Sequence, residues 1–259
     1  MRLFKFVCVV LVAAGPAWAG PGTLKDGGVA HVQTVIDGDT LTLDDGRQVR
    51  LVGIQAPKLP LGRSGFKAWP LGLEAKALLE TLVHGQEVRL RLGSSAQDRH
   101  GRILAHVVRT ADGVWLQGEL LAAGLARVYT VPDNRLLAPD MLALERQARA
   151  DQIGLWALHY YALRNADSVR VDKGTFQVVQ DRVVDVAHVK KRIYMNFGPD
   201  WRSDFTVQIN ARLQKKFSDA GVDLLSLKGR VVRVRGWIKD KNGPLIELDH
   251  PERLEIIPR

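Results

Sequence analysis

The feature that most constrains the fold is a stretch between Val29 and Val52 in which β-branched and other apolar residues alternate with polar ones. Two Asp-Gly steps, at residues 37–38 and 45–46, interrupt this alternation. A period of two is typical of strands that bury one face, and Asp-Gly is a hairpin-turn signal. We therefore expect a meander of three strands over residues 29–52.

The rest of the first 160 residues predicts further strands and three helices. Apolar residues recur at helical spacing over residues 72–84, and Gly85 follows them as a stop signal. The other expected elements are strands at residues 87–92 and 103–108 and helices at 117–123 and 139–158. Residues 20–160 are therefore predicted to form one compact domain that is mainly β with helices, in the α+β class.

A second domain is expected after a polar linker at residues 161–168. A length of 259 residues fits two domains of ordinary size. Residues 169–259 predict three strands, a helix at 211–220 and two strands, which is the order of a small five-stranded OB-like barrel. Many other α+β domains share that order. The expected strands lie at residues 175–189, 191–197, 204–209, 229–238 and 245–248.

The first 19 residues have the three parts of a secretory signal peptide. Arg2 and Lys5 are followed by an apolar run at 6–15 and by a small-x-small cleavage pattern at 17–19. The apolar run is about half of the roughly 20 residues that span a bilayer. We therefore expect an exported protein, periplasmic or secreted, with no membrane anchor after cleavage. The single cysteine, Cys8, would leave with the peptide, which excludes disulfides and cysteine metal sites from the mature chain.

The basic charge of the chain lies mostly in its second half. Lys and Arg number 37 against 28 Asp and Glu, which makes nucleic acid or another polyanion a plausible partner. Residues 20–160 have a net charge of +1, whereas residues 161–259 have 19 basic and 13 acidic residues, a net +6. The sequence indicates neither an oligomeric state nor a preference for DNA or RNA.

In this basic half, we expect nucleic acid to contact residues of one turn and residues on one face of a strand. Side chains alternate along a strand, so positions 233 and 235 share a face. Tyr194, Trp201 and Phe205 are candidate stacking platforms for bases. The alternative is a solvated surface around aromatic core residues. The candidate basic residues are Lys190, Lys191, Arg192, Arg233 and Arg235.

Four short segments carry the chemistry of the first domain. They are Asp37-Gly38-Asp39-Thr40, Arg50-Leu51, Gly53-Ile54-Gln55-Ala56-Pro57 and Asp98-Arg99-His100-Gly101-Arg102. In this order and on this strand meander, they resemble the staphylococcal nuclease (thermonuclease-like) family over residues 29–158, and Gly124-Leu125-Ala126 also matches. The resemblance implies an OB-type five-stranded barrel with flanking helices. Residues 169–259 resemble the extra C-terminal OB-like barrel of some bacterial exported members.

The resemblance also implies a reaction and the roles of five residues. Hydrolysis of a phosphodiester builds negative charge on phosphate oxygens, which Ca²⁺ and forked guanidinium groups can stabilise. By motif position, Asp39 is a metal ligand, Asp37 an outer-shell carboxylate, and Thr40 a neighbour that orients the water shell of the metal. Arg50 and Arg102 occupy the positions of the phosphate clamps.

Two positions depart from the family pattern. The family has Asp as the second metal carboxylate and Glu as the general base, where this chain has Gln55 and Lys58. The two replacements shift the charge of the site by +3. Ca²⁺ is therefore expected to bind poorly, and Lys58 is a poor base at neutral pH. His100 is a conceivable substitute base or an exposed turn residue, and the other histidines show no spacing typical of zinc ligands.

These residues support three hypotheses for function. In the first, an exported nuclease-like protein binds nucleic acid or a nucleotide phosphate through Arg50 and Arg102, but its Ca²⁺-dependent hydrolysis is weakened or lost. In the second, the intact Asp37-Gly38-Asp39-Thr40 segment serves an active endonuclease, a phosphodiesterase with a rearranged site. In the third, the chain is a noncatalytic protein-interaction module.

Overall fold

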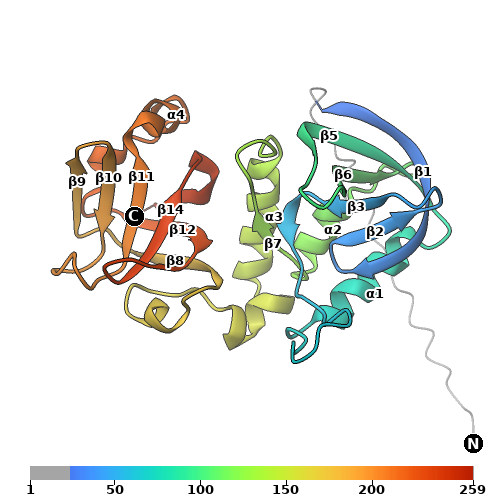
Figure 1. Cartoon of the computed structure of the whole chain (residues 1–259), viewed down its shortest axis with the longest axis horizontal. Coiled ribbons are helices and arrows are strands. Elements are labelled where there is room, and N and C mark those ends of the chain that lie inside the picture. Colours follow the sequence, from blue (N-terminus) through green and yellow to red (C-terminus); the bar gives the residue numbers. More distant parts are fainter. Residues whose placement is uncertain (1–23, 259) are drawn as a thin grey trace, which may run out of the picture.

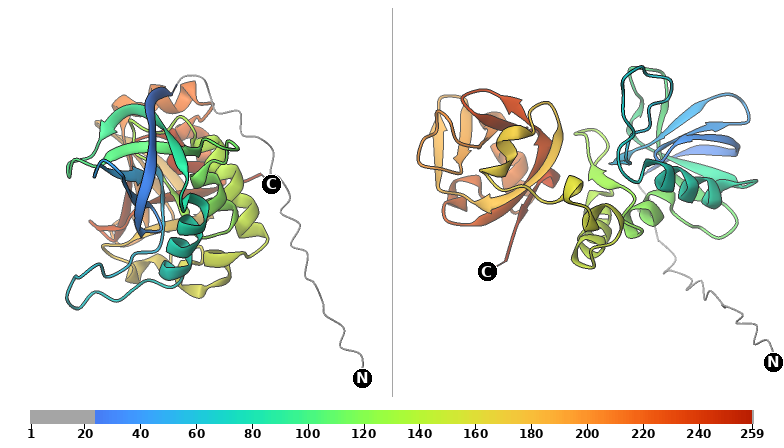
Figure 2. Two further views of the ribbon diagram at one scale, coloured as in Figure 1. Left: turned by 90° about the vertical axis from the view of Figure 1, so that its right-hand side faces the viewer. Right: turned by 90° about the horizontal axis from the view of Figure 1, so that it is seen from below.

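The computed structural model describes residues 24–258, which divide between two bodies with separate hydrophobic cores. Residues 24–161, the barrel region, lie on the right in Figure 1, and residues 162–258, the C-terminal region, lie on the left. The views in Figure 2 show the same arrangement, in which α3 and the chain that follows it lie between the bodies. The predicted signal peptide falls outside the described residues. No helix among residues 24–258 is long and apolar enough to cross a bilayer.

The barrel region contains the predicted strand meander within a closed five-stranded barrel of order β1-β2-β3-β6-β5. Only β3 and β6 pair in parallel, whereas the other neighbours are antiparallel. The OB-type barrel expected from the sequence is confirmed. Its strands are β1 (Lys25–Asp37), β2 (Thr40–Leu43), β3 (Gln48–Leu51), β5 (Glu87–Gln97) and β6 (Ile103–Arg109).

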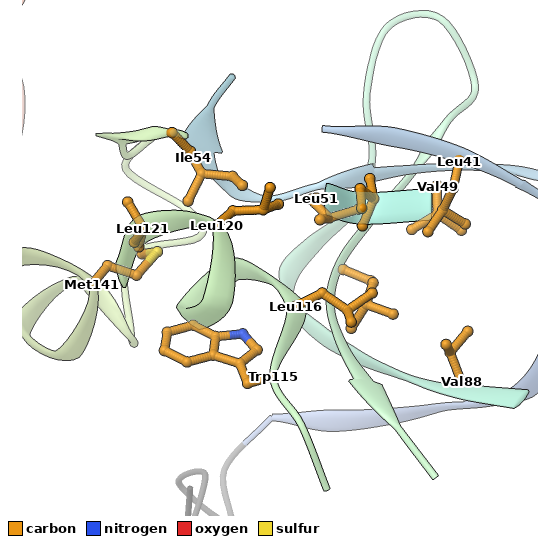
Figure 3. Packing of buried hydrophobic residues seen from close by; sticks show 14 of the residues in the cluster. Leu41, Val49, Leu51, Ile54, Val88, Trp115, Leu116, Leu120, Leu121 and Met141 are labelled. Atoms are coloured by element: carbon orange, nitrogen blue, oxygen red, sulfur yellow. The ribbon is translucent and has the colours of Figure 1, made fainter. Parts of the chain in front are cut away.

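The barrel region also contains three helices: α1 (Gly72–Val83), α2 (Leu116–Ala122) and α3 (Ala138–Ala150). Figure 3 shows Leu116 and Leu120 of α2 among side chains of the barrel strands, including Leu51. All three leucines are 0% exposed. Burial of one such side chain stabilises the fold by about 1.5–3 kcal/mol, so this cluster holds α2 against the barrel.

The last predicted helix, at residues 139–158, is shorter than expected. It ends at Ala150, because Gln152 and Gly154 adopt φ values of 53° and 58° in the left-handed region. The chain then continues as short 3-10 turns, η1 (Gly154–Ala157) and η2 (His159–Tyr161). The Leu155 amide donates to the Gly124 carbonyl at 2.7 Å, which ties this turn to the end of α2.

A two-stranded antiparallel sheet beside the barrel was not anticipated. Strand β4 (Gly53–Gln55) pairs with β7 (Arg127–Tyr129), and the register places Gln55 opposite Arg127. Both strands have only three residues, which is too short for an alternating pattern to stand out in the sequence. This pairing decides where the Gln55 side chain lies.

The C-terminal region encloses its core between two sheets, where the sequence predicts one small barrel. Their strand orders are β13-β14-β11-β10-β9 and β15-β12-β8. The expected order of strands and helix is present, but the strand expected at residues 175–189 is divided into β8 and β9, which lie in different sheets, and the short strands β13 and β15 are additional. The elements are η3 (Ser168–Val171), β8 (Phe176–Arg182), β9 (Asp185–Val189), β10 (Arg192–Asn196), β11 (Thr206–Asn210), η4 (Ala211–Leu213), α4 (Gln214–Asp219), η5 (Leu224–Leu227), β12 (Val231–Trp237), β13 (Lys239–Asp240), β14 (Pro244–Leu248), η6 (Pro251–Arg253) and β15 (Leu254–Ile256).

The segment predicted as a linker, residues 161–168, makes defined contacts with both regions. The Tyr161 hydroxyl donates to the Pro70 carbonyl at 2.7 Å. Arg164 accepts a hydrogen bond from the Gln180 amide at 2.8 Å and donates one to the Val178 carbonyl at 2.9 Å. These bonds extend the edge of the three-stranded sheet, so the connection between the regions is structured.

Candidate active site

The centre of the candidate site is the turn Asp37-Gly38-Asp39-Thr40, which joins β1 to β2. A Cβ at Gly38 would lie 2.6 Å from the Cβ of Ala75 on α1 and 2.7 Å from that of Ala56, so only glycine lets the turn pack this closely. The carboxylate of Asp39 is fully buried, and that of Asp37 is nearly so. Two buried carboxylates this near in sequence require compensating cations.

One compensating cation is Lys58, which follows β4. Its ammonium Nζ lies 3.0 Å from Oδ1 and 2.9 Å from Oδ2 of Asp39, and 3.8 Å from Oδ2 of Asp37. The Ala56 amide also donates to Asp39 Oδ2 at 2.8 Å, and the Thr40 hydroxyl donates to Oδ1 at 3.3 Å. The lysine therefore occupies the space between the two carboxylates.

Arg50 on β3 also faces Asp39. Its Nη2 lies 3.1 Å from Asp39 Oδ2, and its guanidinium donates to the carbonyls of Asp39, Leu51 and Ile54 at 2.5–3.2 Å. Its side chain is 13% exposed. Most N–H groups of the Arg50 guanidinium are therefore hydrogen-bonded within the protein. A phosphate would have to compete with these acceptors.

The pKa values of the Asp37 and Asp39 carboxylates shift in opposite directions. Burial by itself raises the pKa of Asp39, but the charges of Arg50 and Lys58 outweigh it and lower this pKa to about 2. Burial and the adjacent Asp39 carboxylate raise the pKa of Asp37 above its ordinary value. Asp39 is thus held as an anion by its two cations, whereas Asp37 is the weaker acid of the pair.

Arg102, the second predicted clamp, is paired with Asp98. Its Nε and Nη2 both lie 2.7 Å from Oδ2 of Asp98. Among residues 24–258, Arg102 has no hydrogen bond or ion pair with Asp39, Arg50 or Lys58. The structure therefore brings Asp37, Asp39, Thr40, Arg50 and Lys58 together and leaves Arg102 on the neighbouring turn, paired to its own carboxylate.

The side-chain oxygen of Gln55 is bonded to a residue outside the Asp39 cluster. Its Oε1 accepts a hydrogen bond from Nε of Arg127 at 2.9 Å. The Arg127 guanidinium stacks 4.9 Å from the ring centroid of Phe176, and burial lowers the Arg127 pKa to about 10. Sequence reasoning did not identify Arg127, although it directly follows the matched Gly124-Leu125-Ala126 segment.

The residues present do not fit a Ca²⁺ site. Calcium takes six to eight oxygen ligands, but the oxygens of Asp39 already accept from Lys58, Arg50, Ala56 and Thr40, and that of Gln55 accepts from Arg127. No cluster of three or more acidic or histidine side chains with metal-site geometry occurs within residues 24–258. The arrangement provides a buried ion cluster with one ammonium and one guanidinium, which can hold an anion at its partly exposed edge.

The predicted basic surface of the C-terminal region is only partly found. Lys190, Lys191 and Arg192 are exposed at the tip of the β9–β10 hairpin, where no carboxylate of the described chain pairs with them. Arg235, in contrast, is 1% exposed and lies 3.0 Å from Glu145 of the barrel region. Its placement does not fit a role on a nucleic-acid surface.

Arg233 and the three aromatic candidates also divide into buried residues and residues exposed at the surface. The Arg233 side chain is 11% exposed and donates to Gln180 and Glu255 at 2.6–3.3 Å, so it too contributes to packing between strands. Phe205 is fully buried in the core. Trp201 is 52% exposed and Tyr194 is half-buried, and both line one pocket.

The barrel, the Asp-Gly-Asp-Thr turn and the arginine of β3 define a nuclease-like domain. Residues 48–158 match the staphylococcal nuclease homologue family. Protein ParB of Escherichia coli is 31% identical over 186 residues, which cover 64% of this chain and 91% of that protein. The chain belongs to the staphylococcal nuclease homologue family.

Two further relatives match less than half of this chain. A probable staphylococcal-like nuclease, CAN1 of Oryza sativa subsp. japonica, is 34% identical over 110 residues, 42% of this chain and 29% of that protein. Endonuclease YhcR of Bacillus subtilis (strain 168) is 30% identical over 135 residues, 48% of this chain and 11% of that protein. The chain thus spans less than a third of the length of these two relatives.

Proposed function

We propose that the protein binds nucleic acid or a nucleotide phosphate at the barrel site and that its Ca²⁺-dependent phosphodiester hydrolysis is weakened or lost. The observation that carries this proposal is the Lys58 ammonium, 2.9 and 3.0 Å from the two oxygens of Asp39. The family membership supports nucleic acid as the ligand. The family's metal is replaced here by a cation of the chain itself.

The energetic cost to calcium follows from the charges. A divalent ion beside Asp39 must either displace Lys58 or lie next to its ammonium. Two unit charges about 4 Å apart interact by roughly 4 kcal/mol at an effective dielectric constant near 20, which corresponds to about three decades in Kd. Gln55 adds no compensating charge, since its carbonyl is bonded to Arg127.

A second candidate is an active phosphodiesterase with a rearranged site. The intact Asp37-Gly38-Asp39-Thr40 turn and the contact of Arg50 with Asp39 favour it. In this alternative a substrate phosphate draws Lys58 outward and binds between its ammonium and Arg50. The third candidate, a noncatalytic protein-interaction module, becomes the conclusion if neither DNA nor RNA binds at low salt.

The deciding experiment compares the purified chain with a double variant, Gln55→Asp plus Lys58→Glu. Cleavage of single-stranded and double-stranded DNA and RNA is followed while the Ca²⁺ concentration is varied. We expect the double variant to gain Ca²⁺-dependent cleavage by at least about tenfold, because it restores two carboxylates. Lys67→Glu, at an exposed position of the same connecting segment, controls for the charge reversal at Lys58. A parent rate that the double variant barely improves would contradict the proposal.

Nucleic-acid binding has its own test. The logarithm of the binding constant falls with the logarithm of salt concentration in proportion to the number of phosphates neutralised. Replacement of Arg102 by Gln is expected to weaken binding and to reduce this slope by about one if Arg102 contacts a phosphate. An unchanged slope would remove Arg102 from the proposed interface.

The proposal includes export, periplasmic or secreted, which rests on the pattern of residues 1–19. Expression in a bacterial host, followed by fractionation and N-terminal sequencing, tests it. Export predicts a mature protein that begins near residue 20 and is found outside the cytoplasm. A cytoplasmic product that retains Cys8 would contradict this part of the proposal.

A further inference from the structure

A pocket of about 410 Å³ lies on the outer face of the five-stranded sheet in the C-terminal region, apart from the barrel site. Its volume is within the range of small-molecule sites, about 300–1,000 Å³. Strands β9, β10, β11 and β14 each contribute to its lining, and the β10–β11 and β13–β14 connections supply the remainder. The proposed function of the barrel site does not use this pocket.

The pocket is mainly apolar and aromatic with a few polar groups, and its lining is set by the alternation of side chains across the sheet. Ile193 and Val207 face the hydrophobic core and are 0% exposed, whereas Tyr194 and Gln208 face the pocket. The register places Tyr194 directly opposite Gln208 on the neighbouring strand. An aromatic ring and an amide therefore form adjacent parts of the pocket floor.

Gln208 carries a buried hydrogen-bond acceptor that the described chain does not satisfy. The side chain is 7% exposed, and its Nε2 donates to Oε1 of Glu247 at 3.2 Å. That bond fixes the orientation of the amide, since only the nitrogen can donate to a carboxylate. Its Oε1 is buried and has no partner among residues 24–258. Buried acceptors nearly always have a donor, so this atom is an acceptor that an N–H or O–H group of a ligand, or a water, would satisfy.

The loop that carries Trp201 is held in place before any ligand binds. The carboxylate of Asp204 accepts from the Asp200 amide at 2.6 Å and from Arg170 at 2.9 Å. A Cβ at Gly243 would lie 2.3 Å from the Ser203 carbonyl, so the β13–β14 turn packs directly on this loop. A preformed pocket loses less entropy when a ligand binds.

Charges around the pocket favour an anionic chain. The acidic side chain of Asp185 is paired with Lys228 at 2.8 Å, and Glu247 is paired with Lys239. Lys241 at the rim pairs with no carboxylate of the described residues. The three exposed cations at residues 190–192 end the same β9–β10 hairpin, and Arg192 shares the face of Tyr194, two residues away.

We propose that this pocket binds an unstacked base of a single-stranded nucleic acid. Trp201 and Tyr194 supply the aromatic surfaces, and the free acceptor of Gln208 receives an N–H of the base. Lys241 and the hairpin cations contact the flanking phosphates. The choice of ligand class rests on the proposed function, whereas the pocket itself does not depend on the barrel site.

The role of the Gln208 acceptor is tested with two oligonucleotides that differ in one hydrogen-bond donor on each base. Oligouridylate carries an N3–H on each base, whereas oligo-3-methyluridylate does not. Fluorescence anisotropy with the full chain is expected to show about five- to tenfold tighter binding of oligouridylate. In Gln208→Met, which keeps the length of the side chain, this preference is expected to disappear. Equal binding of both ligands by the parent chain would overturn the acceptor role.

The stacking surface is tested by Trp201→Ala, which alters an exposed side chain. Stacking on an aromatic residue predicts about 5- to 100-fold weaker binding of both oligonucleotides. Leu225→Ala, an exposed apolar residue of the same region outside the pocket, is the matched control and should change affinity by less than about twofold. Equal effects of the two variants would contradict the proposal.

Photocross-linking separates this proposal from that of the barrel site. A single-stranded oligonucleotide with 4-thiouridine is irradiated with the full chain, and the linked peptides are identified by mass spectrometry. Cross-links within residues 194–208 support the pocket. Links confined to peptides around Arg50 and Lys58 overturn it and leave the proposed function intact, and no links contradict both. Binding of neutral oligosaccharides that requires Trp201 would assign the pocket to a sugar instead.

Discussion

Lys58 and Asp39 form the closest ion pair of the barrel site. A lysine that follows a strand would ordinarily extend into solvent, yet the side chain of Lys58 is only 25% exposed and both Asp39 oxygens accept from it. The substitution therefore does more than delete a carboxylate. It places a fixed cation between Asp37 and Asp39, and the lowered pKa of Asp39, about 2, reflects this cation together with Arg50.

The pKa of Asp39 predicts how stability depends on pH. A carboxylate whose pKa is lower in the folded state contributes stability above its unfolded pKa and loses it as the pH falls. A shift from 3.8 to about 2 corresponds to about 2 kcal/mol, lost between about pH 5 and pH 2. Urea unfolding is expected to show this loss in the parent chain and not in Asp39→Asn. Asp140→Asn, at an exposed position of α3, should retain the parent's slope.

At the scale of secondary-structure elements, the end of α2 and the turn after α3 depend on each other. Gly124 and Gly154 both have φ near 60°, and their backbones touch. The sequence predicts where α2 stops, because glycine is a stop signal. It does not predict that α3 ends at Ala150, because that end requires Gly154 to contact a segment thirty residues away, which no local pattern records.

A comparison of alanine substitutions at Gly154 and Gly113 separates the cost of backbone strain from the cost of a steric clash. Gly154→Ala places a Cβ 2.4 Å from the Gly124 carbonyl oxygen, in addition to a left-handed φ. Gly113 also has a left-handed φ, 75°, but a Cβ there meets open space. We expect Gly113→Ala to cost about 1–2 kcal/mol and Gly154→Ala clearly more, measured by urea unfolding. Equal costs would show that the contact between the two turns carries no strain.

At the scale of the whole molecule, a buried ion cluster joins the two regions. Arg235 of β12 lies 3.0 Å from Glu145 of α3 and 2.8 Å from Glu255 of β15. The Thr130 hydroxyl and Nε2 of His250 form a second cross-contact at 2.6 Å. Because these groups are enclosed, the regions are expected to unfold together.

Arg235→Met tests this coupling. It leaves Glu145 with Arg149 as its one remaining cationic partner among the described residues. Loss of one member of a buried ion pair costs about 3–5 kcal/mol. We expect such a loss, together with separate unfolding transitions for the two regions, in urea titrations followed by fluorescence and circular dichroism. Lys215→Met, which removes an exposed pair on α4, should leave a single transition at the parent's midpoint. A single unshifted transition in Arg235→Met would contradict the coupling.

The sequence by itself determined the class of the barrel region. The alternation between residues 29 and 52, the Asp-Gly turns and the Asp-Gly-Asp-Thr segment are local signals, and the barrel that they predict is present. The sequence also shows Gln55 and Lys58 at the positions where the resemblance implies two acidic residues. Alternation of side chains along a strand does not depend on distant residues.

Only the tertiary structure decided what the other charged side chains do. Arg233 and Arg235 have the spacing of a basic surface, but their strand packs against the barrel region, so Arg235 is buried and paired. Gln55 has the spacing of a metal ligand, but the pairing of β4 with β7 turns its oxygen toward Arg127. The physical reason is the same in both cases. A charged or polar side chain takes the partner that burial requires, and that partner comes from a segment remote in sequence.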